Sequence, residues 1–175
     1  ANITNGVWLP VVLPQLPNDD LGTILEPYVD AVADSYNEVF DKPMFFSEYA
    51  LSMMKLAGEV SLVNGSRHDH LIERMNQKPV VAIYFPTAVH GFSVNASREQ
   101  MATLPNNFSL SGLDAVIAMI MYPDILARDV HTPRLDLSAL SWQSADHSLY
   151  FKGHDEGLEF GSTDSLAHAY GRTSS

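Results

Sequence analysis

The sequence predicts a single α+β domain, in which a small and mostly antiparallel sheet packs against several helices. Several segments carry apolar residues at helical spacing, and one segment near the C-terminal end has the alternation of an antiparallel hairpin. No stretch is long enough to act as a linker between two domains. With 175 residues, of which 46% are hydrophobic, the chain can bury roughly 70% of its unfolded surface in one core.

The first segment is apolar, but Pro10, Pro14 and Pro17 interrupt it. Proline has no backbone N–H to donate, and it is therefore confined to edge strands and extended segments. We expect an extended apolar arm over residues 1–17, followed by one globular domain over residues 18–175. Such an arm must cover apolar surface, either on this chain's own core or on a neighbouring subunit. The predicted interface residues of the arm are Trp8, Leu9, Val11 and Leu13.

A first helix is expected over residues 27–40, because proline suits a first helical position and apolar residues recur there at helical spacing. Asp30, Asp34 and Glu38 follow one another at i, i+4 on another face of this helix. Like charges at that spacing repel by a few tenths of a kcal/mol each. Tertiary packing must therefore hold the helix, and this acidic stripe should stay exposed as a surface for a protein partner.

The middle of the chain predicts two more helices and a strand. Ser47 and Asn64-Gly65 bound a helix over residues 47–63, and Ser66 opens a shorter one over residues 66–76. The continuous apolar run of residues 80–85 is typical of a strand that is buried on both faces. Residues 92–95 are its expected partner.

The last third of the chain contains the strongest signals. After a short helical turn capped by Ser97, residues 113–121 are apolar on nearly all sides, which predicts a helix through the centre of the fold. Residues 148–152 and 157–160 alternate between apolar and more polar side chains, which predicts a half-buried antiparallel hairpin. A short C-terminal helix is expected near residues 164–170.

One pair of histidines has the spacing of metal ligands. On a strand, the side chains of His68 and His70 would share a face and could bind one metal ion. On a helix, they would point about 200° apart around the axis. The Ser66 cap and the apolar spacing that follows favour a helix. We therefore expect His68 on the apolar side, and no metal site.

Catalytic residues are hard to assign, because no glycine-rich phosphate loop, HExxH motif or GxSxG motif is present in the sequence. His90 follows the expected strand 80–85, and functional sites are often built on loops at such positions. Together with Asp124, Asp129 or His131 it could form an acid/base pair, although nothing in the sequence brings these residues together.

Composition limits the partners and the compartment. The formal net charge is -11, and residues 1–41 contain no Lys or Arg. We expect no nucleic-acid partner, because binding to phosphates needs clusters of basic residues. A basic protein surface would be electrostatically complementary to this acidic chain. The chain has no cysteine, which excludes disulfides and thiol nucleophiles. The longest apolar stretch is far below the ~20 residues of a membrane helix. We expect a soluble protein of the cytoplasm or a virion rather than a secreted one.

These observations favour a non-enzymatic protein that acts through protein–protein contacts, with a second copy or a basic protein as its partner and no cofactor. A phage or virion assembly component is one version, and a neutralising partner of a basic toxin is another. Two alternatives stay open. One is a hydrolase with a His/Asp pair or a His-bound metal, and the other is a small-molecule binding domain with its pocket beside the helix of residues 113–121.

Overall fold

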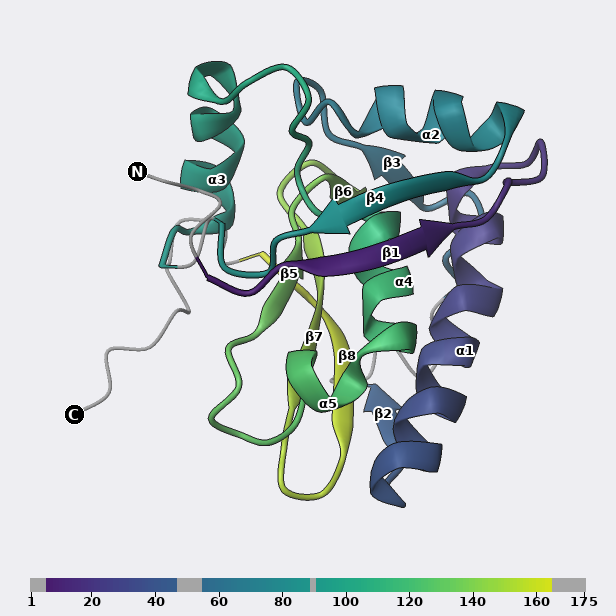
Figure 1. The fold of residues 1–175 in the computed structure, drawn as a ribbon, viewed down its shortest axis with the longest axis vertical. Coiled ribbons are helices and arrows are strands. Elements are labelled where there is room, and N and C mark those ends of the chain that lie inside the picture. Colours follow the sequence, from purple (N-terminus) through teal and green to yellow (C-terminus); the bar gives the residue numbers. More distant parts are fainter. Residues whose placement is uncertain (1–5, 47–54, 89–90, 165–175) are drawn as a thin grey trace.

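A computed structural model of the chain describes residues 6–46, 55–88 and 91–164, and the helix α4 (Leu113–Met121) lies at its centre (Figure 1). Six of the seven residues from Leu113 to Met119 are buried. The helix packs against α1 (Leu21–Phe40), against strand β1 (Leu9–Leu13) and against β5 (Leu135–Leu137). The prediction of a central helix over residues 113–121 is therefore confirmed.

Three small sheets surround this helix. The first is a ribbon of two antiparallel strands, β1 and β4 (Val80–Tyr84). The second has the order β2 (Met44–Phe46), β8 (Leu158–Thr163), β7 (Ser148–Gly153), β5, and within it only β2 and β8 run parallel. The third pairs β3 (Val60–Leu62) with β6 (Leu140–Trp142) in antiparallel fashion. The predicted class, one α+β domain with mostly antiparallel pairing, is confirmed.

The remaining helices are short. They are α2 (His68–Gln77), α3 (Val94–Gln100), the 3-10 turn η1 (Met101–Thr103) and α5 (Pro123–Leu126). Arg98 anchors α3, because its guanidinium donates hydrogen bonds to the backbone carbonyls of Ser138, Leu140 and Ala145 at 3.0–3.3 Å. This clamp holds α3 against the turn between β5 and β6.

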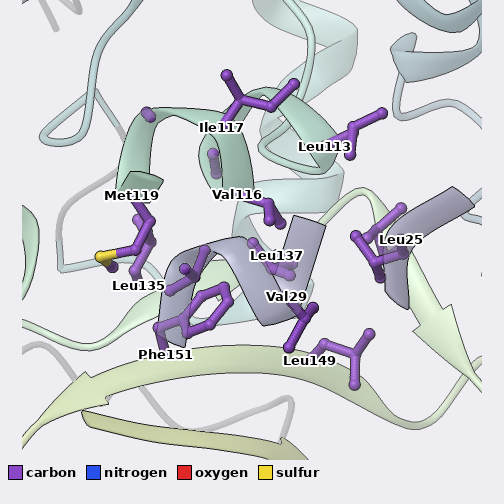
Figure 2. Packing of buried hydrophobic residues seen from close by; sticks show 14 of the residues in the cluster. Leu25, Val29, Leu113, Val116, Ile117, Met119, Leu135, Leu137, Leu149 and Phe151 are labelled. Carbon is purple, nitrogen blue, oxygen red and sulfur yellow. The ribbon is translucent and has the colours of Figure 1, made fainter. Parts of the chain in front are cut away.

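The main core lies between α4, α1 and the inner face of the four-stranded sheet (Figure 2). Strand alternation sends one set of side chains from β5, β7 and β8 toward the helices. The fully buried members of this set are Leu137, Leu149, Phe151, Leu158 and Phe160. The rings of Phe151 and Phe160 pack at a centroid distance of 4.8 Å.

Helix α1 begins six residues earlier than expected, at Leu21 rather than Pro27. The Asp20 carboxylate caps it by accepting hydrogen bonds from the backbone N–H groups of Gly22 and Thr23. Pro27 lies within the second turn of the helix, and the apolar stripe of the helix packs in the core. Gly22 is required for this packing, since a Cβ there would overlap the Leu56 carbonyl.

Two expectations for the middle of the chain are wrong. Residues 60–62 form β3 and not the end of a helix, while residues 47–54 lie outside the described part of the chain. Strand 80–84 exists, but only one of its faces is buried, and its partner is β1 rather than residues 92–95, the last two of which begin α3. Short strands lack a readable period, so an apolar run alone could not decide between these arrangements.

Four other expectations have mixed outcomes. The shorter helix is confirmed as α2, and the hairpin is confirmed as β7 and β8, although it is buried on both faces rather than on one. Ser93, and not Ser97, caps α3. The helix expected near residues 164–170 lies almost entirely beyond the last described residue, Asp164.

The segment expected to be an apolar arm contains the strand β1. Leu9, Val11 and Leu13 point into this chain's own core, whereas Trp8 and Val12 point outward. Removal of residues 1–17 would therefore leave an apolar face of α4 uncovered.

This alternation predicts that two neighbouring valines contribute very differently to stability. Val11→Ala should lower the free energy of unfolding by roughly 1–3 kcal/mol, because Val11 is fully buried and its loss leaves a cavity. Val12→Ala should change it by less than about 0.5 kcal/mol. Urea denaturation of both variants measures the difference, and equal losses would contradict the register of β1.

Candidate functional site

The outward side of the β1–β4 ribbon is an exposed apolar surface. The register pairs Val12 with Val81 and Pro10 with Ile83, and all four side chains point away from α4. Trp8 continues the row at one end. We call these five residues the outer face. The exposed fraction is 76% for Val81, 60% for Trp8 and 58% for Val12.

The outer face is unusual because it contains no charged side chain in a chain with a net charge of -11. Contiguous exposed apolar surface on a protein typically marks a contact with another molecule. One backbone edge of the ribbon is partly blocked. Pro10 has no N–H to offer, and its carbonyl accepts a hydrogen bond from the Tyr122 hydroxyl at 2.8 Å. This edge of β1 is thus poorly suited to the addition of another strand.

The predicted interface residues separate into two groups. Trp8 belongs to the outer face, but Leu9, Val11 and Leu13 are buried in this chain's core and face no external surface. Val81 and Ile83, which were not predicted, complete the outer face from the other strand. The acidic stripe of Asp30, Asp34 and Glu38 is exposed along α1.

His68 has a structural position rather than one suited to binding a metal. The ring is fully buried, and it bridges two backbone groups before α4. Nδ1 donates to the Leu110 carbonyl at 3.1 Å, and Nε2 accepts from the Leu113 N–H at 3.0 Å. Both nitrogens are therefore occupied in the neutral tautomer. His70 is exposed on the other side of α2, so the two imidazoles diverge as the helical spacing predicts.

The acid/base candidates do not form a described pair. His90 lies outside the described residues, and Asp124 and His131 are both exposed. Asp129 accepts hydrogen bonds from the backbone N–H groups of His131 and Thr132, which is the geometry of a turn. Among the residues that the structure describes, no three His, Asp or Glu side chains are grouped so as to hold a metal ion.

A cavity of about 170 Å³ opens beside the C-terminal end of β4. It lies between segments that are far apart in sequence: the end of β4, the residues before α4, the helix α5 and the approach to β5. Its apolar walls include Val7, Phe85, Phe92, Leu110, Ile125 and Leu126. Its polar lining includes Tyr84, Ser111, Arg134 and Asp136.

The polar lining is an ordered set of groups. Arg134 Nη2 lies 2.7 Å from Asp136 Oδ1, and its guanidinium stacks over the Tyr150 ring at 4.7 Å. The Tyr84 hydroxyl lies 3.4 Å from Ser111 Oγ. The cation of Arg134 is thus matched by one carboxylate and covered by one aromatic ring.

Burial shifts the ionisation of two of these groups. It raises the pKa of the Asp136 carboxyl above its ordinary value, and the neighbouring Arg134 guanidinium opposes this effect. Burial also raises the pKa of Tyr84, and the carboxylates of Asp114 and Asp136 raise it further. The Tyr84 hydroxyl therefore remains protonated at neutral pH and can donate a hydrogen bond.

A second polar cluster lies next to the cavity on the same face of the sheet. The Tyr150 hydroxyl donates to Glu159 Oε1 at 2.7 Å, and His154 Nε2 bonds to Glu159 Oε2. Because Arg134 stacks on the Tyr150 ring, this cluster is in contact with the polar lining of the cavity.

Sequence reasoning missed the residues of this cavity. Arg134 and Asp136 alternate with Leu135 and Leu137, which is the period of a strand with one polar and one apolar face. That signal is only four residues long. Tyr84 and Ser111 come from other segments, and no local pattern shows that they meet Asp136.

No protein-family model, no curated protein and no solved structure matches this chain. No helix within residues 6–46, 55–88 and 91–164 combines the length and the hydropathy needed to cross a bilayer. Function has to be inferred from the residues themselves.

The buried histidine predicts a pH dependence of stability. Burial lowers the pKa of His68, although Asp114, whose Oδ1 is 3.9 Å from Nδ1, acts in the opposite direction. The folded protein therefore binds this proton more weakly than the unfolded chain. Its contribution to stability is complete above the unfolded value of about 6.5, and it is lost as the pH falls below that value.

Denaturation at pH 7 and pH 5 tests this expectation with two matched variants. His68→Gln should be less stable at pH 7 by roughly 1–3 kcal/mol, because the Leu110 and Leu113 backbone groups lose their partner. It should also lose less stability on acidification than the unmodified protein. His70→Gln, the same change at an exposed position of α2, should retain the original pH dependence. An unchanged slope in His68→Gln would contradict the assignment.

Proposed function

We propose that this protein acts through protein–protein contacts, with the outer face as the buried centre of the interface. The observation that carries the proposal is the register of β1 and β4, which aligns Trp8, Pro10, Val12, Val81 and Ile83 on one side of the ribbon. A two-stranded ribbon has one side for the core and one for water. Here the side toward water is apolar as well. Covering this side with a partner removes apolar surface from water, which is favourable.

A second copy of the chain is the partner that the outer face suits best. In a two-fold dimer the same patch meets itself, so the patch must be self-complementary. Two molecules that each carry a charge of -11 repel, and a patch without carboxylates is the place where they approach at least cost. Trp8 is the natural anchor, because a large aromatic side chain contributes most when it becomes fully covered.

The acidic stripe supports a second candidate, the binding of a basic protein. Asp30, Asp34 and Glu38 are exposed and spaced one turn apart on α1, with no basic residue in the last turn of that helix. Charges at this spacing repel one another, and a basic surface would relieve that repulsion. Such binding should weaken as the salt concentration rises.

Light scattering at several protein concentrations tests the role of the outer face. The unmodified protein should show a concentration-dependent increase in mass, and Val81→Lys should remain a monomer because a buried ammonium group has no partner at the apolar centre. Val39→Lys is the matched control, since Val39 is an exposed valine at the end of α1, away from the ribbon. It should associate like the unmodified protein.

Two results would contradict self-association through this face. One is a monomer at all concentrations up to several hundred micromolar, and the other is loss of association in both variants. The acidic stripe is tested separately with Asp34→Asn. That change should weaken binding to a basic model protein such as a polylysine-tagged domain, and it should leave the scattering mass of the protein alone unchanged.

A further inference from the structure

We infer that the cavity between β4, α5 and β5 binds a small organic molecule that has an apolar body and a hydrogen-bond-donating head, such as a phenol, an alcohol or a protonated amine. The head would reach Asp136, and the body would lie between the apolar walls. This site is independent of the outer face. It uses the ends of β4 and β5 and the residues before α4, and the outer-face residues do not line it.

The size of the cavity limits the ligand. A volume of about 170 Å³ is close to that of engineered protein cavities of ~150 Å³ that take up benzene. A single ring with a one- or two-atom head therefore fits, whereas a nucleotide does not. Phe85, Phe92, Ile125 and Leu126 supply apolar walls from different segments of the chain. Such a mixture of apolar walls and a few polar groups is typical of small-molecule sites.

The carboxylate of Asp136 decides the chemistry of the head. Asp136 lines the cavity, and its buried Oδ1 has only the ion pair with Arg134 Nη2 at 2.7 Å and no hydrogen bond of good geometry. A largely buried carboxylate with an unsatisfied oxygen is costly, and a ligand that donates a hydrogen bond to this carboxylate would reduce the cost. The burial that raises the pKa of Asp136 is consistent with an incompletely solvated carboxyl group.

The charges around the cavity disfavour an anionic ligand. Arg134 is matched by Asp136 and stacked on Tyr150, so its charge is already compensated. Asp114 lies close enough to act on the Tyr84 hydroxyl and adds a further negative charge. Counted together, Arg134, Asp136 and Asp114 carry a net charge of about -1 at neutral pH, which favours a neutral donor or a cation.

Four probes with the same ring distinguish the head groups: benzene, phenol, benzylamine and benzoate. Binding is measured at pH 7 from the chemical-shift changes of backbone amides in two-dimensional NMR spectra. Phenol and benzylamine should bind with dissociation constants about tenfold lower than that of benzoate, which corresponds to one charge-assisted hydrogen bond. The largest shifts should fall on residues that line the cavity, including Ser111 and Leu126.

Two kinds of variant keep the test decisive. Asp136→Asn should weaken benzylamine about tenfold and benzene by less than about twofold. Because this change could also disturb Arg134, Ile125→Trp provides a second test. Ile125 is a partly exposed wall residue, and a large ring there should block all four probes without altering the core. Met121→Trp is the matched control, since Met121 is equally exposed and does not line the cavity.

The inference would be overturned by any of three results. The first is that benzoate binds as tightly as benzylamine, and the second is that Ile125→Trp binds the probes as the unmodified protein does. The third is that no probe binds with a dissociation constant below about 10 mM. Failure of self-association in the light-scattering experiment would leave this inference unaffected, because the two sites share no side chain.

Discussion

The burial of α4 is the constraint on which the rest of the structure depends. A helix that is apolar on nearly all sides must be covered on all of them, and no single element can do this. α1 covers one side, the β1–β4 ribbon another, and the four-stranded sheet a third. His68 holds the start of the helix, because its two ring nitrogens form hydrogen bonds with the Leu110 carbonyl and the Leu113 N–H. The buried histidine thus positions the central element.

The β1–β4 ribbon covers one side of α4, and it has only two strands. Two strands are too few to be stable without a face that packs on a core. Leu9, Val11 and Leu13 supply that face, although Pro10 lies among them. Proline is acceptable because β1 is an edge strand whose remaining side needs no donor. The outward side chains are then free of any packing requirement, and yet they are apolar.

Local patterns predicted the parts of this fold in which one element is long and regular. The helix of residues 113–121 and the hairpin of residues 148–160 were both readable from periodicity. Strands of three residues, such as β3 and β6, have no measurable period, and residues 60–62 were therefore assigned to a helix. The cavity was unreadable for another reason. Tyr84, Ser111 and Asp136 line one cavity, although they come from β4, from the residues before α4 and from β5.

Strand β4 contributes residues both to the outer face and to the cavity, and its register keeps the two sets apart. Val81 and Ile83 point outward to the outer face, while Tyr84 turns inward to line the cavity. A shift of one residue would exchange the two sets, placing the Tyr84 hydroxyl in solvent and the apolar side chains in the core. The pairing of Val12 with Val81 and of Leu9 with Tyr84 excludes that exchange. One short strand therefore contributes side chains both to an exposed apolar surface and to the polar wall of a cavity.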